Sequence, residues 1–152
     1  KLIRYRASIS KSFLSYHPKK GEPTMFHQQI EFCIKIHTIR GNYDLWAKRF
    51  EKINKGLAVL ELYQWTGKPY NSNCETIRIL TKDDGIGIEK LEFKESTLGR
   101  LCNPLVNGKS VNYLTLCRND GLGPIEFNDW FKPYDINEPY AIIHFTDFRY
   151  AG

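Results

Sequence analysis

A short segment in the first third of the chain brings together three side chains with complementary chemistry. Lys35, Thr38 and Arg40 lie in the run Lys-Ile-His-Thr-Ile-Arg. A lysine with a depressed pKa can take the proton of a hydroxyl, and a fixed guanidinium can stabilise the oxyanion that forms when the hydroxyl attacks a carbonyl. The residue types therefore suit acyl transfer, and an exposed basic loop is the alternative interpretation.

The local conformation of this segment decides whether its groups can meet. A strand would place Lys35 and Thr38 on opposite faces, whereas a bend or a helical turn brings residues i and i+3 together. The segment lies between two expected helices and is followed by Gly41-Asn42. We therefore expect a tight bend over residues 35–40.

A long amphipathic helix is expected directly after this bend, over Tyr43–Lys55. Asn42 is a suitable N-cap, and Gly56 suits the left-handed position after the last turn. Trp46 and Phe50 belong to an apolar stripe that should face the core. The exposed side should carry four cations: Lys48, Arg49, Lys52 and Lys55.

Two shorter helices are expected on either side of the chain's middle. After Pro23, Phe26 and Ile30 recur at helical spacing and predict a short helix into Cys33. Another helix should begin near Pro124, because proline is well tolerated in the first helical turn.

The remaining segments are typical of strands. The expected strands are residues 2–14, Leu57–Trp65, Thr76–Leu80, Ile86–Phe93, Val111–Cys117 and Tyr140–Phe145, with an irregular stretch over Ser96–Pro104. Five or six short, mostly antiparallel strands with two or three flanking helices indicate an α+β protein whose sheet could close into a small barrel. With 152 residues and no linker or repeat, we expect one domain over residues 1–152.

Charge is distributed unevenly along the chain. The net charge is 22 − 17 = +5, made up of 12 − 4 = +8 in residues 1–56 and 10 − 13 = −3 in residues 57–152. The basic excess fits an anionic partner such as nucleic acid, and a solvated basic face is the alternative.

Several classes of protein are excluded by composition and motif. No run approaches the roughly 20 apolar residues of a membrane-spanning helix, and the four cysteines lack C-x-x-C spacing, so we expect reduced thiols, a cytoplasmic protein and no membrane partner. The chain has no Walker A loop, dinucleotide fingerprint, H-E-x-x-H or zinc-deaminase signature. Because its histidines also lack ligand spacing, we expect neither a metal site nor a cofactor.

The pattern K-x-x-T-x-R, with Lys35, Thr38 and Arg40 after a short helix, resembles the signature of the ASCH domain superfamily. The best match is to the small bacterial N(4)-acetylcytidine amidohydrolases, in which a lysine, a threonine and a glutamate are the proposed catalytic set. In that family the acid precedes a helix that leads into the last strand. Asp120 holds the equivalent position here, with a side chain one methylene shorter than glutamate.

The resemblance implies a PUA-like β-barrel associated with RNA, and leaves an insertion-like region at about residues 83–108. It also implies a first functional hypothesis, an amidohydrolase that removes an acyl group from a cytidine-type base. In that hypothesis Lys35 is the general base and Thr38 is the nucleophile. Asp120 orients Lys35 or serves the leaving amine, and Arg40 stabilises developing charge.

Substrate-binding candidates lie beyond the next strand. Trp65 and Tyr70 flank a turn that contains Lys68, a further substrate-binding candidate, and the two rings could stack on a base. Trp65 equally fits a strand-end aromatic of the core. The second hypothesis is a non-catalytic RNA-binding module whose partner is RNA or a modified nucleoside, and the third is a small-ligand or protein-binding domain that keeps only the fold.

Overall fold

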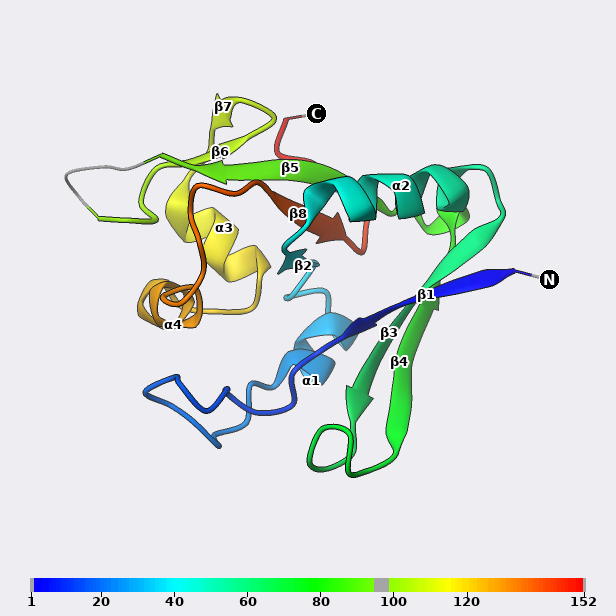
Figure 1. Cartoon of the computed structure of the whole chain (residues 1–152), viewed down its shortest axis with the longest axis horizontal. Coiled ribbons are helices and arrows are strands. Elements are labelled where there is room, and N and C mark those ends of the chain that lie inside the picture. Colours follow the sequence, from blue (N-terminus) through cyan, green and yellow to red (C-terminus); the bar gives the residue numbers. More distant parts are fainter. Residues whose placement is uncertain (1, 95–98, 152) are drawn as a thin grey trace.

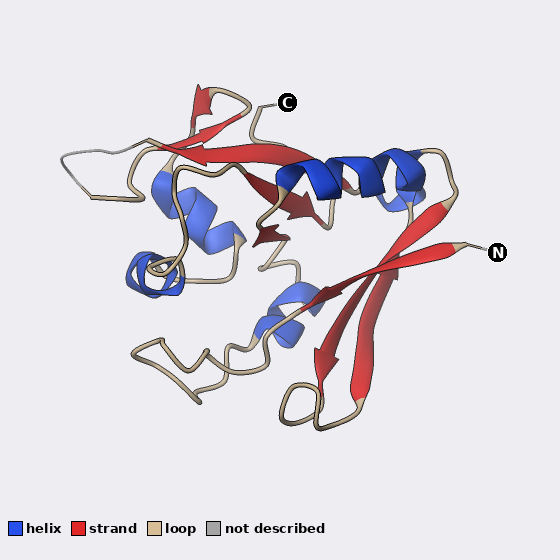
Figure 2. Cartoon of the chain, in the orientation of Figure 1, coloured by secondary structure: helices blue, strands red, loops and turns tan. Residues whose placement is uncertain are grey.

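The computed structural model describes residues 2–94 and 99–151. Within them lie eight strands, four α-helices and one 3₁₀ turn, η1, which confirms the α+β class with more elements than expected (Figures 1 and 2). In chain order they are β1 (Ile3–Ser8), α1 (Phe26–Glu31), β2 (His37–Arg40), α2 (Tyr43–Asn54), β3 (Ala58–Trp65), β4 (Cys74–Leu80), η1 (Lys82–Asp84), β5 (Gly87–Phe93), β6 (Pro104–Val106), β7 (Lys109–Ser110), α3 (Tyr113–Asn119), α4 (Pro124–Trp130) and β8 (Tyr140–His144).

The strands form two separate sheets. A three-stranded sheet has the order β1-β3-β4, with β1 parallel and β4 antiparallel to β3. A five-stranded antiparallel sheet has the order β2-β8-β5-β6-β7. Within residues 2–94 and 99–151 no ladder joins the two sheets, so the expected closed barrel is not confirmed.

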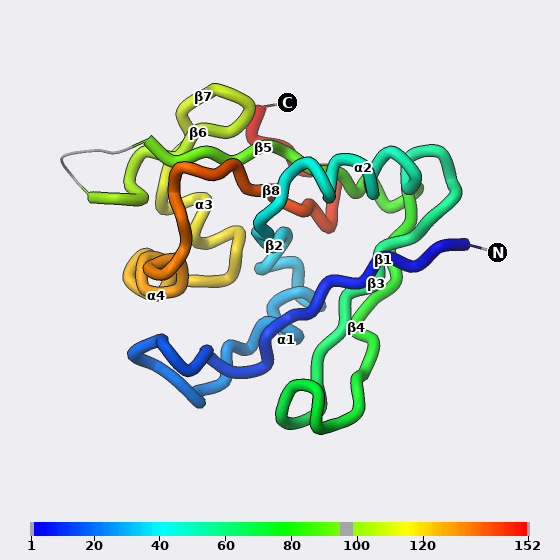
Figure 3. The backbone as a smooth tube through the Cα atoms, in the orientation of Figure 1, coloured from blue at the N-terminus to red at the C-terminus, as the bar shows by residue number. Residues whose placement is uncertain are grey.

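The core lies between the sheets and under α2. Figure 3 shows β1 beside β3, and β2 beside β8, although β8 is the last strand in the sequence. Helix α2 packs against β3, β5 and β8, and so spans both sheets. Its predicted stripe is buried, as are Leu60 and Leu62 of β3 and every residue of β8. This packing fixes β2 at the edge of the five-stranded sheet, where the candidate site forms.

The helix and turn signals of the sequence are mostly confirmed. Helix α2 begins at Tyr43, and the Asn42 side chain accepts a hydrogen bond from the Leu45 amide at 3.2 Å. Gly56 has a φ of +76°, as expected for a residue that follows a helix. Helix α4 begins at Pro124 behind Gly123. In the described part of the chain, no helix has the length and apolarity needed to cross a membrane.

Three expectations about local structure are wrong. Residues 37–40 form strand β2 instead of a tight bend, because they pair with β8 and bury His37, Thr38 and Ile39. Residues 113–119 form α3 instead of a strand: Asn112 caps the helix, and Leu116 and Cys117 lie on its buried face. Strand β1 ends at Ser8, well before residue 14.

The region 83–108 is part of the five-stranded sheet and is more than an insertion on the surface. Its strand β5 lies inside the five-stranded sheet, between β8 and β6. The irregular stretch expected from Ser96 begins outside the described residues, and β6 occupies its end.

Candidate functional site

Four of the predicted site residues, Lys35, Thr38, Arg40 and Asp120, line one small cleft. Its empty volume, including the open mouth, is about 310 Å³. The cleft is completed by apolar and aromatic side chains and one serine: Ile9, Ser10, Phe26, Ile39, Leu122, Trp130 and Phe131. Charged groups among aromatic walls are typical of a site that orients a flat polar molecule.

Lys35 reaches the cleft through the turn that ends α1. Cys33 adopts the left-handed conformation, with φ of 57°, and the amides of Ile34 and Lys35 both donate to the Gln29 carbonyl, at 2.8 and 3.2 Å. The Ile36 amide then donates to the Asn119 carbonyl at 2.9 Å, which ties this turn to the end of α3. Because Lys35 precedes β2, the strand does not separate it from Thr38.

Asp120 is held against Lys35 by the glycine that follows it. Asp120 caps the C-terminus of α3, and Gly121 has a φ of +83°. A Cβ at Gly121 would lie 2.9 Å from the Gln29 side-chain oxygen and 3.2 Å from the Lys35 Cβ. Only glycine therefore combines this backbone conformation with so close an approach of α3 to the lysine turn.

Lys35 forms a buried ion pair with Asp120. Its amine donates to the Asp120 carbonyl at 2.7 Å and to the Asp120 carboxylate at 3.3 Å, and it lies 4.2 Å from the centre of the Phe26 ring. Only 2% of Lys35 is exposed. Burial lowers the pKa of Lys35, and the charge of Arg40 acts in the same direction, although Asp120 opposes both. A lysine of this kind can lose its proton more easily than an ordinary one.

Arg40 holds the Thr38 hydroxyl. The two side chains lie on the same face of β2 because they are two residues apart. Arg40 donates to the Thr38 Oγ1 at 2.7 Å and also to the backbone carbonyls of Ile39 and Ser8. Among the described residues no hydrogen bond joins the Lys35 amine to the Thr38 hydroxyl, although both groups line the cleft. The guanidinium would stabilise an alkoxide at Thr38.

A buried chain of hydrogen bonds behind Asp120 was not predicted. His37 Nδ1 lies 3.3 Å from the Asp120 carboxylate, and His37 Nε2 lies 2.6 Å from the Tyr150 hydroxyl. The Asn119 side-chain amide donates to the same hydroxyl at 3.0 Å. We call these four residues, with Lys35, the buried polar chain.

The protonation state of His37 sets the direction of the hydrogen bonds in the buried polar chain. Burial lowers the pKa of His37, which favours the neutral imidazole. Because the Asp120 carboxylate only accepts, the ring proton of the neutral form lies on Nδ1, which donates to Asp120. His37 Nε2 then accepts from the Tyr150 hydroxyl, whose oxygen accepts from the Asn119 amide. The carboxylate is thereby oriented toward the Lys35 amine by groups on three segments of the chain.

A second buried pair anchors the end of the chain near His37. Glu89 of β5 lies 2.8 Å from His144 Nε2 and accepts the backbone amides of Tyr150 and Ala151 at 2.8 and 3.0 Å. Burial lowers the pKa of His144 to about 2. No local sequence signal marks Tyr150 or Glu89, because each acts across the fold.

The other predicted binding residues lie away from the cleft. Trp65 ends β3, and Lys68 and Tyr70 belong to the turn before β4, so none of the three lines the cleft. Trp65 is half-buried, which is intermediate between an open stacking surface and a core aromatic. Its ring centre lies 5.1 Å from that of Tyr70. Within the described ranges, no three His, Cys, Asp or Glu side chains are grouped to hold a metal ion.

Comparisons of the chain with protein-family models, with curated proteins and with solved structures find no match. The chemistry of the cleft therefore has to be argued from its own groups. A buried lysine, a threonine hydroxyl bound to a guanidinium, and a carboxylate that orients the lysine can together transfer an acyl group.

Proposed function

We propose that the cleft hydrolyses an N-acylated cytidine-type base, with Thr38 as the nucleophile and Lys35 as the general base. The observation that carries the proposal is the convergence of Lys35, Thr38, Arg40 and Asp120 on one cleft, with the lysine buried against the carboxylate. We also propose that the two sheets are a PUA-like arrangement of the ASCH type. The order of the short helix, the lysine–threonine–arginine segment, the acid, the helix α4 and the last strand supports that relationship.

In the first step, the neutral Lys35 amine takes the proton of the Thr38 hydroxyl while Oγ1 bonds to the acyl carbonyl carbon. The carbonyl electron pair moves to the oxygen, and the resulting oxyanion is stabilised by Arg40. The oxyanion then re-forms the carbonyl and the C–N bond breaks. The exocyclic nitrogen of the base takes the proton from Lys35, which leaves an amino-base and an acyl ester on Thr38.

In the second half, water replaces the departed base. Lys35 takes a proton from that water as it attacks the ester. As the tetrahedral intermediate collapses and the C–Oγ1 bond breaks, the Lys35 ammonium gives this proton to Thr38 Oγ1. One water is consumed and a carboxylic acid is released. Asp120 is not consumed: it orients the Lys35 amine and stabilises the ammonium that forms in each half.

The walls of the cleft suit a planar base. Phe26, Trp130 and Phe131 present aromatic surfaces beside the charged groups. Phe26 and Trp130 have ring centres 5.7 Å apart, and Phe26 also lies beside the Lys35 amine. Aromatic surfaces of this kind hold a nucleobase by stacking, while the cations select the acyl oxygen.

The test is hydrolysis of N4-acetylcytidine by the full chain, followed as cytidine released. We expect turnover by the wild type and a loss of at least about a hundredfold in Lys35→Met and in Thr38→Val, since both remove a group that acts in the transition state. Lys132→Met and Thr115→Val are matched controls, because neither residue lines the cleft. Folded wild type without turnover, or equal rates in all five proteins, would overturn the proposal.

The alternative is a non-catalytic RNA-binding module of the same fold. It is favoured by the basic first third of the chain, where the net charge is 12 − 4 = +8 over residues 1–56. Such a module would bind RNA with an affinity that falls steeply with salt, would release no cytidine, and would be indifferent to Thr38→Val.

A further inference from the structure

One face of the three-stranded sheet carries arginines and aromatic rings in register. Parallel pairing sets Arg6 opposite Glu61, and Ser8 opposite Tyr63. Their side chains point away from Leu60 and Leu62, which are buried in the core on the other face. We call this the outer face; Arg4, Arg6, Tyr63, Trp65 and Tyr70 are its principal residues.

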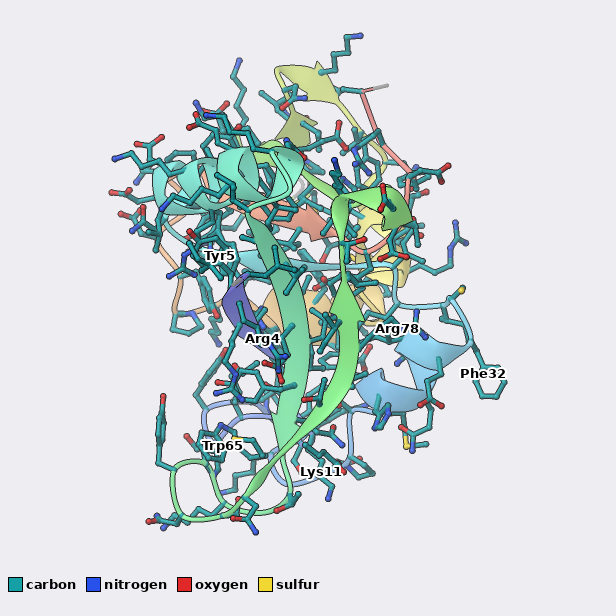
Figure 4. The ribbon with its side chains drawn as sticks, turned by 90° about the vertical axis from the view of Figure 1, so that its right-hand side faces the viewer. Arg4, Tyr5, Lys11, Phe32, Trp65 and Arg78 are labelled. Atoms are coloured by element: carbon teal, nitrogen blue, oxygen red, sulfur yellow. The ribbon has the colours of Figure 1, made fainter. Side chains whose placement is uncertain are left out.

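Three aromatic rings follow one another along the outer face. The ring centres of Tyr63 and Trp65 are 6.1 Å apart, and those of Trp65 and Tyr70 are 5.1 Å apart. Tyr70 is 87% exposed and has a φ of 64° in the turn after β3, so its ring is presented to solvent at the tip. In Figure 4 Trp65 lies toward the end of the sheet at which this turn projects. Tyr63 and Trp65 are half-buried and Tyr70 is exposed, so the row offers most of its ring surface at the Tyr70 end.

Two arginines lie beside the Tyr63 end of this row. The Arg6 guanidinium lies 3.8 Å from the centre of the Tyr63 ring. Arg4 and Arg6 both contact the Glu61 carboxylate, at 3.6 and 3.3 Å, and Thr76 donates to it at 2.5 Å. Glu61 is buried beneath the two arginines, whose side chains stay 55% and 46% exposed. One carboxylate thus positions two cations and neutralises only one of them.

We propose that the outer face binds a single-stranded nucleic acid. Bases would stack on Trp65 and Tyr70, and phosphates would contact Arg4 and Arg6. A polyanion with flat, unpaired bases complements both features of the face, since stacking needs open rings and the excess charge is positive. Lys68, in the same turn as Tyr70, adds a third cation. A duplex would leave the rings unused, because its bases are already stacked.

The outer face is distinct from the cleft, so this inference goes beyond the proposed hydrolysis. None of its principal residues lines the cleft. The two regions share the end of β1: Arg40 donates to the Ser8 carbonyl, and the Ile9 amide donates to the Tyr63 carbonyl at 2.7 Å.

The test is fluorescence anisotropy of the full chain with labelled oligouridine, oligothymidine and a duplex, each of about ten nucleotides. We expect single strands to bind more tightly than the duplex, and Tyr70→Ala to weaken single-strand binding about tenfold. Arg4→Gln should weaken it and flatten its salt dependence. Lys52→Gln, an equal change of charge on α2, should alter the affinity less than about twofold.

Equal affinity for oligouridine and oligothymidine, or tighter binding of oligouridine through its 2′-hydroxyls, would both support the proposal. Three outcomes would overturn it: no binding at low salt, a duplex bound as tightly as the single strands, or Lys52→Gln as harmful as Arg4→Gln with Tyr70→Ala silent. The oligonucleotides carry no acyl group. A failure here therefore leaves the proposed hydrolysis untouched, and a failure of hydrolysis leaves this binding untouched.

Discussion

Beside β2, Lys35 and Asp120 are paired below the surface, whereas on the three-stranded sheet Arg4 and Arg6 share Glu61 and remain about half exposed. The first pair is joined to His37 and Tyr150 by a continuous run of buried hydrogen bonds. The second is a cluster with an unmatched positive charge. Buried charges are costly and must be fully paired, while exposed ones gain little from pairing and stay available to ligands. This difference in burial and pairing is consistent with the two proposals, proton transfer in the cleft and ligand recognition on the outer face.

The largest expected difference between the regions is in stability. Asp120→Ala should lower the free energy of unfolding by about 3–5 kcal/mol, because it removes the only carboxylate paired with the buried Lys35 amine in the described residues. Arg4→Ala should cost under about 1 kcal/mol, because Arg4 is exposed and Arg6 still pairs with Glu61. Urea unfolding of the two variants at neutral pH measures both values. Equal losses would show that the buried polar chain has no special energetic role.

Acid should affect the buried histidines strongly. The pKa of His144 falls to about 2 in the folded chain, from an ordinary value of 6.5, and the pKa of His37 is lowered too. Below pH 6.5 the unfolded chain takes up these protons and the folded chain does not, so stability is complete above that pH and falls as the pH drops. From pH 7 to about 4.5, His144 alone should cost about 2–3 kcal/mol.

Urea unfolding over this pH range gives the measurement, with His144→Gln as the variant in which the acid loss should shrink. His27→Gln is the matched control, since His27 lies on α1 in an i,i+4 pair with Glu31 and is partly exposed. A pH dependence that His144→Gln leaves unchanged would contradict the assignment.

A smaller effect is expected from the end of the chain. Tyr150→Phe removes the hydroxyl that joins His37 to Asn119, and should cost about 1–2 kcal/mol, because it leaves buried polar atoms without partners. It should also lower kcat for acetylcytidine hydrolysis, since Asp120 loses part of its support. Tyr70→Phe, the same change on the outer face, should leave stability within about 0.5 kcal/mol. Identical stability and kcat for Tyr150→Phe and wild type would show that the Tyr150 hydroxyl does not support the site.

The sequence predicted the parts of the site whose signals are local. Lys35, Thr38 and Arg40 are close along the chain, and the caps and apolar spacing of α2 are contained within one helix. Asp120 could be placed only through the resemblance. The predictions failed where contacts between distant parts of the chain determine the local structure. Strand β2 is one example, because it is a strand through its pairing with β8. Residues 113–119 are helical through the Asn112 cap and the burial of one face, which a short apolar run does not reveal.

His37 and Tyr150 show the same limit. They are 113 positions apart and meet only after β2 has paired with β8 and Glu89 has bound the last residues of the chain. Histidine and tyrosine also have many structural uses, so neither residue type points to a site by itself. Trp65, Lys68 and Tyr70 were predicted to serve the same substrate as Lys35, but the fold puts them on another surface.

The central claim, that buried Lys35 is the base for Thr38, is tested most directly by the pH dependence of kcat/KM for N4-acetylcytidine. The rate should rise with pH through the pKa of Lys35, below that of an ordinary lysine. Asp120 raises this pKa and Arg40 lowers it. The acidic limb should therefore move to lower pH in Asp120→Asn and to higher pH in Arg40→Gln. A limb that stays in place in both variants, or that moves in the same direction in both, would contradict the assignment of Lys35 as the base.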